Sequence, residues 1–172
     1  MSIPLLAQAA TQGTFEKEFF PPFDEAAEKV MSLAKAMPEE KYGWRPAPGV
    51  RSVSETYVHI ANGNRLLLTF VSAKALDKAQ LGELIKANAD KEGTLKDKDQ
   101  ILAFLKASMD EVRKVAHGMS EADLNRAVKF FGTETTVRGI FIDILGHLRE
   151  HLGQSIAYAR MNGVTPPWSA GQ

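Results

Sequence analysis

Apolar residues recur at steps of three and four positions over four long stretches, a spacing typical of helices with one buried face. The first stretch covers about 14–37, and the other three cover about 52–75, 97–116 and 135–161. Pro21 and Pro22 lie inside the first, so we expect a kink or a late start near Pro22. The apolar stripe of the first stretch consists of Phe15, Phe19, Phe23, Ala27, Val30 and Leu33.

Residues typical of helix starts and helix ends support the limits of these stretches. Ser52 is followed three positions later by Glu55, the pattern of a capping box that begins a helix. The fourth stretch ends at Asn162 and Gly163, and the prolines at 166–167 prevent the helix from resuming. Between the second and third stretches lies a polar, lysine-rich segment, 77–97, where we expect a short helix at 81–88 and a break at Gly93.

The pattern predicts an all-α protein, a four-helix bundle with a long crossover connection, because the connecting segments are longer than an up-down bundle requires. Two short strands are expected within 127–139, where β-branched and aromatic residues gather. We expect a single domain over 14–168 and a disordered or leader-like start at 1–13. The "AQA" at 7–9 has the small residues of a cleavage site, although no basic residue precedes it.

The amino-acid composition argues against several classes of partner and site. Lys and Arg together number 21, as do Asp and Glu, so the net charge gives no reason to expect nucleic acid or a membrane surface as partner. The absence of cysteine excludes disulfides, thiolate metal ligands and a cysteine nucleophile. No apolar run reaches the roughly 18–20 residues of a membrane span. We expect a cytoplasmic protein, while the leader-like start leaves export open.

Two of the four histidines stand in "HLREH", residues 147–151. On a helical wheel His147 and His151 fall on the apolar face of the fourth helix, and a spacing of four lets two imidazoles reach one ion. Two half-buried, hydrogen-bonded core histidines would give the same pattern. A third histidine, His59, falls on the core-facing side of the second helix, one turn before Gly63, whose missing side chain leaves room for a ring.

Three imidazoles buried in the core would each need hydrogen-bond partners for a donor and an acceptor nitrogen. One divalent ion would bind a nitrogen from all three. We therefore predict a metal site made of His59, His147 and His151 that leaves coordination positions open, as catalytic sites do. Nitrogen ligands suit zinc or nickel. Asn62 and Gln154 are candidate pocket residues or partners of the ligands, as is Glu55 unless the helix cap occupies it. His117 precedes a glycine at a helix end and is interpreted as structural.

The stretches "WRPAPGVRSVSETYVHIANGN" and "GHLREHLGQSIAYARMNGVTPP" resemble the two signatures of the DinB/YfiT-like metalloenzymes, and the resemblance covers about 14–168. It implies a four-helix bundle of unusual connectivity in which His59, His147 and His151 bind a divalent metal, commonly zinc or nickel. It also implies a homodimer, to which Trp168 in the tail could contribute. Characterised relatives include transferases and isomerases that use low-molecular-weight thiols.

Two functions follow as hypotheses. The first is a metal-dependent enzyme that activates a thiol or water for a small-molecule substrate, of the thiol S-transferase or hydrolase type. The alternative is a bundle that keeps the metal site but acts as a non-catalytic binding or sensing module.

Overall fold

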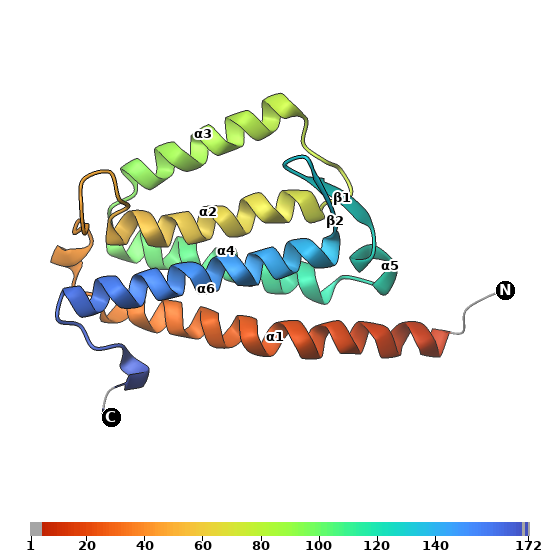
Figure 1. The fold of residues 1–172 in the computed structure, drawn as a ribbon, viewed down its shortest axis with the longest axis horizontal. Coiled ribbons are helices and arrows are strands. Elements are labelled where there is room, and N and C mark those ends of the chain that lie inside the picture. The colour runs from red at the N-terminus through yellow and green to blue at the C-terminus, as the bar shows by residue number, and fades with distance from the viewer. Residues whose placement is uncertain (1–4, 170, 172) are drawn as a thin grey trace.

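Four long helices pack side by side in the computed structural model, which describes residues 5–169 and 171 (Figure 1). They are α1 (Leu5–Ala36), α2 (Val53–Val71), α4 (Lys98–His117) and α6 (Val137–Met161). Their buried faces form one continuous apolar core. The predicted all-α bundle is confirmed, and the capping box at Ser52 and Glu55 begins α2 as expected.

A fifth helix, α3 (Lys78–Thr94), makes the crossover. In Figure 1, α2 and α4 run in the same direction, and α3 returns the chain along the outside of the bundle between them. This helix is longer than the predicted segment 81–88, and it continues through Gly93. Asp77 caps its start by accepting hydrogen bonds from Ala79 and Gln80. No residue of α3 is buried, so the sequence has no apolar stripe there to show its full length.

The structure corrects two other limits. Helix α1 begins at Leu5 and includes Pro21 and Pro22, so a late start near Pro22 is wrong. Residues 1–4 lie outside the described residues, and a leader role for 1–13 stays a prediction. Helix α2 ends at Val71 instead of near Ala75, because Ser72 leaves the helical conformation with ψ at 143°.

The predicted hairpin is present before α6. Strands β1 (Ala127–Phe130) and β2 (Thr133–Thr136) pair antiparallel, with Phe130 opposite Thr133. Both residues of the turn, Phe131 and Gly132, have positive φ, as tight hairpin turns require. Thr136 ends β2 and also caps α6, since its hydroxyl accepts a hydrogen bond from the Gly139 amide. No linker therefore separates the hairpin from α6.

Aromatic side chains join α1 to α6 in this part of the core. The ring centroid of Phe141 lies 5.3 Å from those of Phe15 and Phe19, and all three side chains are buried. Trp168 is half-buried against the core of the same chain. The remaining short elements are η1 (Glu39–Lys41), α5 (Glu121–Leu124) and η2 (Pro167–Ser169).

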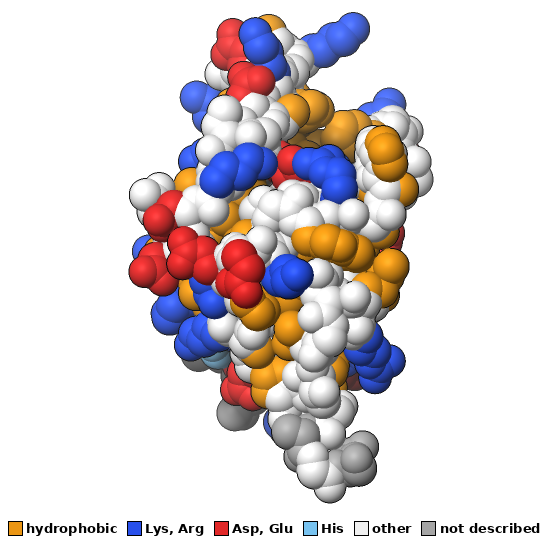
Figure 2. All heavy atoms as spheres, turned by 90° about the vertical axis from the view of Figure 1, so that its left-hand side faces the viewer, with side chains coloured by type: hydrophobic (Ala, Val, Ile, Leu, Met, Phe, Trp, Pro, Cys, Tyr) orange, Lys and Arg blue, Asp and Glu red, His pale blue; other side chains and the backbone are white. Residues whose placement is uncertain are grey.

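The described helices include none that is both long and apolar enough to cross a membrane. Figure 2 looks at the end of the bundle where the segment between α1 and α2 lies, and it shows acidic and basic side chains near one another on that face. Surface charge of both signs at this end agrees with the balanced composition.

Candidate metal centre

Helices α2 and α6 bring three histidines together on the inner side of the bundle. His59 comes from α2, and His147 and His151 come from adjacent turns of α6. One ring nitrogen from each of them lies within 4.8 Å of the other two. The Nε2 atoms of His59 and His147 are 3.2 Å apart. The structure thus assembles the trio that the sequence predicted, across 88 residues of chain.

Gly63 makes this approach of α2 to α6 feasible. A Cβ atom at position 63 would overlap the ring of His147, with Nδ1 at 2.8 Å and Nε2 at 2.9 Å. Nδ1 of His147 is buried and has no hydrogen-bond partner among the described residues. Packing against the bare backbone of Gly63 and the hydrogen bond between the Nε2 atoms of His147 and His59 therefore position this ring.

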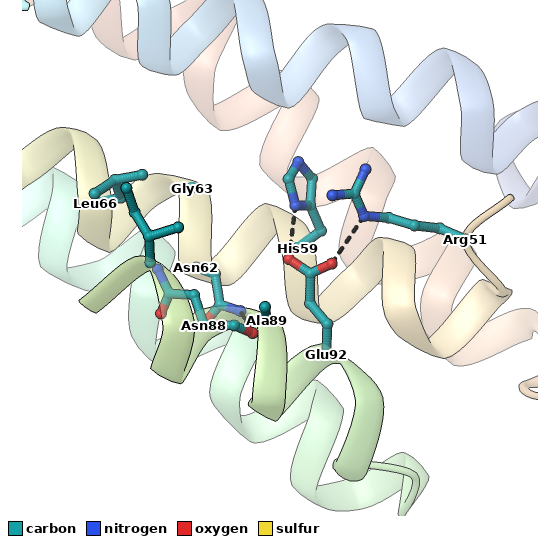
Figure 3. A pocket seen from close by; sticks show the side chains of 9 residues that line it. Arg51, His59, Asn62, Gly63, Leu66, Asn88, Ala89 and Glu92 are labelled. Carbon is teal, nitrogen blue, oxygen red and sulfur yellow. Dashed lines mark hydrogen bonds and ion pairs between the residues drawn. The ribbon is translucent and has the colours of Figure 1, made fainter. Parts of the chain in front are cut away.

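The ring of His59 is oriented by a carboxylate from α3. Its Nδ1 donates a hydrogen bond to Glu92 Oε1 at 2.8 Å, and the Nε of Arg51 donates to Glu92 Oε2, also at 2.8 Å (Figure 3). Burial acts to raise the pKa of Glu92, but the bonds from His59 and Arg51 outweigh it and hold the pKa below its usual value. An ionised Glu92 fixes the proton of His59 on Nδ1 and leaves Nε2 free as a ligand.

A second series of hydrogen bonds orients His151. Its Nδ1 donates to Gln154 Oε1 at 2.7 Å. The amide of Gln154 donates to the hydroxyl of Tyr158 at 2.8 Å, and that hydroxyl donates to the backbone carbonyl of Arg51 at 3.0 Å. Nε2 of His151 is left available to a metal ion. The hydrogen bonds that start at His59 and those that start at His151 both end at Arg51.

The other predicted residues have different places. Asn62 lines a pocket beside His59, and its amide donates to the carbonyl of Asn88 on α3. Glu55 lies outside the group: its carboxylate completes the helix cap and pairs with Arg45 and Lys96. Its role as a pocket residue or ligand is therefore not supported by its contacts. His117 stacks on Phe20 and pairs with Glu16, which fits a structural role.

Sequence reasoning missed Glu92, Arg51 and Tyr158. Glu92 belongs to a helix without an apolar stripe, and Arg51 to a loop, so neither position carries a periodic signal. The spacing of Gln154 and Tyr158, four apart on α6, is the one local sign of the series of hydrogen bonds that reaches Arg51.

Burial keeps two of the rings neutral. Burial, followed by the neighbouring charges of His151 and His59, lowers the pKa of His147 to about 3. Burial also lowers the pKa of His151, against the hydrogen bond to Gln154. Both imidazoles therefore offer a lone pair at neutral pH, which a metal ligand must do.

These residues fit a divalent ion. Two nitrogens bound to one tetrahedral ion at about 2.0–2.1 Å lie roughly 3.3 Å apart, close to the 3.2 Å between His59 and His147. The remaining ring nitrogen of His59 bonds to a carboxylate, and that of His151 to an amide oxygen, as is usual around metal-bound histidines. The three-histidine group could therefore hold a divalent metal.

Two pockets adjoin the histidines. The larger one, about 590 Å³, lies between α2, β1 and α6. Its walls combine apolar side chains with two acidic ones on α6, and they include Leu66, Leu67, Phe130, Ile142, Asp143 and Glu150. The smaller one, about 210 Å³, lies between α2 and α3, where the polar residues Arg51, Asn62, Asn88 and Glu92 line it together with the apolar Leu66, Ile85 and Ala89 (Figure 3). His59 and Gly63 border both.

The sequence profile of the DinB superfamily matches residues 23–155, which include all three histidines. The chain belongs to the DinB superfamily. The resemblance seen in the two sequence signatures is thereby confirmed, and the fold agrees with that of DinB-like proteins of known structure.

Two crystal structures illustrate this agreement. A DinB-like protein from Bacillus cereus is 18% identical, with a TM-score of 0.70 over 88% of this chain and 95% of that one. A DinB-like protein from Bacillus subtilis is 19% identical, with a TM-score of 0.66 over 86% of this chain and 93% of that one. At these identities the likeness concerns the fold alone. No curated protein matches the chain.

Proposed function

We propose that this DinB-superfamily protein is a metal-dependent enzyme in which His59, His147 and His151 hold one divalent ion, zinc or nickel. The observation that carries the proposal is the convergence of three histidine nitrogens within 4.8 Å of one another beside an open pocket. Three neutral imidazoles leave coordination positions open, and a divalent ion in such a site lowers the pKa of a bound water or thiol.

The chain's own residues would prepare that chemistry. Glu92 and Gln154 hold the Nδ1 protons of His59 and His151, so both rings present Nε2 to the ion. Leu66, Phe130 and Ile142 would contact an apolar part of the substrate and exclude water from it. The reaction class that fits is transfer to or from a low-molecular-weight thiol, or hydrolysis by an activated water.

The direct test is elemental analysis of the purified protein after zinc or nickel loading. We expect one ion per chain in the wild type and none in His147→Ala or His151→Ala. His117→Ala is the matched control, because this histidine pairs with Glu16 away from the group. A wild type that binds no stoichiometric metal would rule out the proposal. If metal binds, a screen of small thiols with electrophilic acceptors tests the transferase.

One observation favours a second function, a non-catalytic metal-binding or sensing module. Glu92, which orients His59, belongs to a helix with no buried residue. Metal binding at His59 would therefore change how α3 packs against α2, and a partner protein that contacts α3 would bind one of the two states more tightly. Loaded protein that turns over no substrate, but whose α3 exchanges amide hydrogens more slowly with metal than without, would favour the sensor.

We also propose a homodimer. The tail residue Trp168 packs partly against the core of its own chain and is half-buried, and its contact with a partner stays a prediction. Support comes from two large exposed apolar side chains near the junction of the hairpin and α6, Phe131 and Ile142, which are 59% and 64% exposed. Sedimentation equilibrium gives the mass of the assembly directly, and a monomer at micromolar concentration would contradict this proposal.

A further inference from the structure

Arg51 is held at the edge of the histidine group by two contacts from different helices. Its backbone carbonyl accepts a hydrogen bond from Tyr158 on α6. Its Nε donates to Glu92 on α3, whose other oxygen is bound by His59 (Figure 3). The side chain is 43% exposed, yet both its base and its Nε are fixed. An arginine held in this way is positioned before any ligand arrives.

The free end of that side chain faces the site. Among the described residues, neither terminal nitrogen of Arg51 has a hydrogen-bond partner. Figure 3 shows the guanidinium extending toward the ring of His59, and both residues line the same 210 Å³ pocket.

The local charge leaves a place for an anion. Arg51 and Glu92 form an ion pair and cancel each other, and the histidines bind metal in their neutral form. Asp143 and Glu150 line the other pocket, on α6. Among the described residues that line the pocket on the α3 side, Glu92 is the one acidic residue, so a divalent ion would there add two positive charges beside the end of a guanidinium. The two terminal N–H groups of an arginine form a planar fork that matches the two oxygens of a carboxylate.

We propose that Arg51 binds a carboxylate group of the small molecule on which the centre acts, so that its preferred ligands are carboxylates. The inference rests on the proposed metal-dependent function and names its substrate class. Glu92 positions the guanidinium and His59 together, which places the anion anchor and the metal ligand at a fixed distance from each other.

The experiment compares two thiols that differ in a carboxylate, 3-mercaptopropionate and 2-mercaptoethanol. The protein is loaded with Co²⁺ as a spectroscopic probe, and the thiolate–cobalt absorption is titrated. We expect the wild type to bind 3-mercaptopropionate at least about tenfold more tightly. Arg51→Gln should lose that preference and keep its affinity for 2-mercaptoethanol. Arg51→Lys, which keeps the charge without the fork, should retain part of it.

Arg45→Gln is the matched control, because Arg45 lies in the same loop, is 41% exposed and pairs with Glu55 away from the pocket. It should behave as the wild type. An Arg51→Gln protein that binds cobalt and still prefers the carboxylate as strongly as the wild type would overturn the inference.

A second measurement separates this inference from the proposed function. In metal-free protein, NMR follows the side-chain N–H signals of Arg51 while 3-mercaptopropionate or 2-mercaptoethanol is added. We expect saturable shifts with the first thiol alone. A wild type that binds no metal but shows these shifts would refute the metal-dependent function and keep the carboxylate site. No shift with 3-mercaptopropionate would refute the site whether or not metal binds.

Discussion

At the scale of single residues, Gly63 controls how closely the two histidine-bearing helices, α2 and α6, approach each other. Replacing it with alanine puts a Cβ atom onto the ring of His147. Alanine is ordinarily the better helix residue by about 0.5–1 kcal/mol, so a loss caused by Gly63→Ala would be steric in origin. We expect metal affinity to fall at least about tenfold, the effect of roughly 1.4 kcal/mol, measured by competition with a chromophoric chelator.

The control for this change is Gly153→Ala. Gly153 lies on α6, and a Cβ atom there meets nothing within 4 Å. This variant should keep the metal affinity of the wild type and gain a little thermal stability. Equal metal affinity in Gly63→Ala and Gly153→Ala would show that His147 is not a ligand in its observed position.

Glu92 gives the second prediction at this scale. Glu92→Ala removes the acceptor that holds the Nδ1 proton of His59, and losses of such partners typically cost 10–100-fold in metal affinity. Glu92→Gln keeps an acceptor oxygen without the charge, so its affinity should lie between those of Glu92→Ala and the wild type. Isothermal titration of zinc into metal-free protein measures all three.

Glu111→Gln is the comparison variant for these titrations. Glu111 accepts two hydrogen bonds from Arg65, both at 2.9 Å, and so joins α4 to α2 through an arginine away from the histidines. It should leave zinc affinity unchanged. A similar loss in Glu111→Gln and Glu92→Ala would mean that general destabilisation, and not the orientation of His59, explains the effect.

The sequence was sufficient to predict that three histidines come together, but it did not reveal the groups that orient them. His147 and His151 share a helical face with apolar residues, and Gly63 indicated room beside His59, so periodicity alone predicted that the rings converge. The hydrogen bond between Glu92 and His59 joins positions 33 residues apart in the sequence, and that between Arg51 and Glu92 joins positions 41 residues apart. Such contacts depend on how α3 docks, which no local pattern encodes.

At the scale of elements, α3 differs from the bundle helices because none of its residues is buried. Its contacts with α2 include the bonds of Glu92 to His59 and of Asn62 to the carbonyl of Asn88. Helices with few buried contacts open at low free-energy cost. We expect α3 amides to exchange hydrogen faster than those of α2, α4 and α6, as measured by mass spectrometry. Protection of α3 equal to that of α4 would contradict this prediction.

The same polarity explains what could be predicted of the elements. The four bundle helices bury stripes of apolar residues, and the sequence showed all four. The predicted limits of α4 and α6 lie within two residues of the observed ones, whereas α1 begins at Leu5 instead of near 14 and α2 ends at Val71 instead of near 75. The extent of α3 could have been read only from the cap at Asp77 and from the absence of proline, which the prediction did not use. The isolated Gly93 does not end the helix. A glycine near an exposed helix end costs only about 1 kcal/mol, which the intact hydrogen bonds of the helix can offset.

At the scale of the whole molecule, metal should stabilise the fold, because its ligands come from both α2 and α6. A ligand that binds only the folded state at 100 times its Kd adds about 2.7 kcal/mol to the free energy of unfolding. We expect zinc to raise the melting temperature of chelator-treated wild type by several degrees and to leave that of His151→Ala unchanged. Differential scanning calorimetry measures both, and an equal rise in the two proteins would place the bound zinc elsewhere.

The junction between the hairpin and α6 has a consequence for insertions. Thr136 belongs to β2 and caps α6 as well, so the strand pairing also sets the rotation of α6 about its axis. One residue added between Thr136 and Val137, and taken into the first turn of the helix, would rotate the rest of α6 by about 100° relative to the hairpin, and His147 would no longer face His59. The same residue added at the turn, Phe131–Gly132, would lengthen the loop without adding to the helix. Two insertions about five positions apart should thus differ, since the first would abolish the histidine group and the second would keep it.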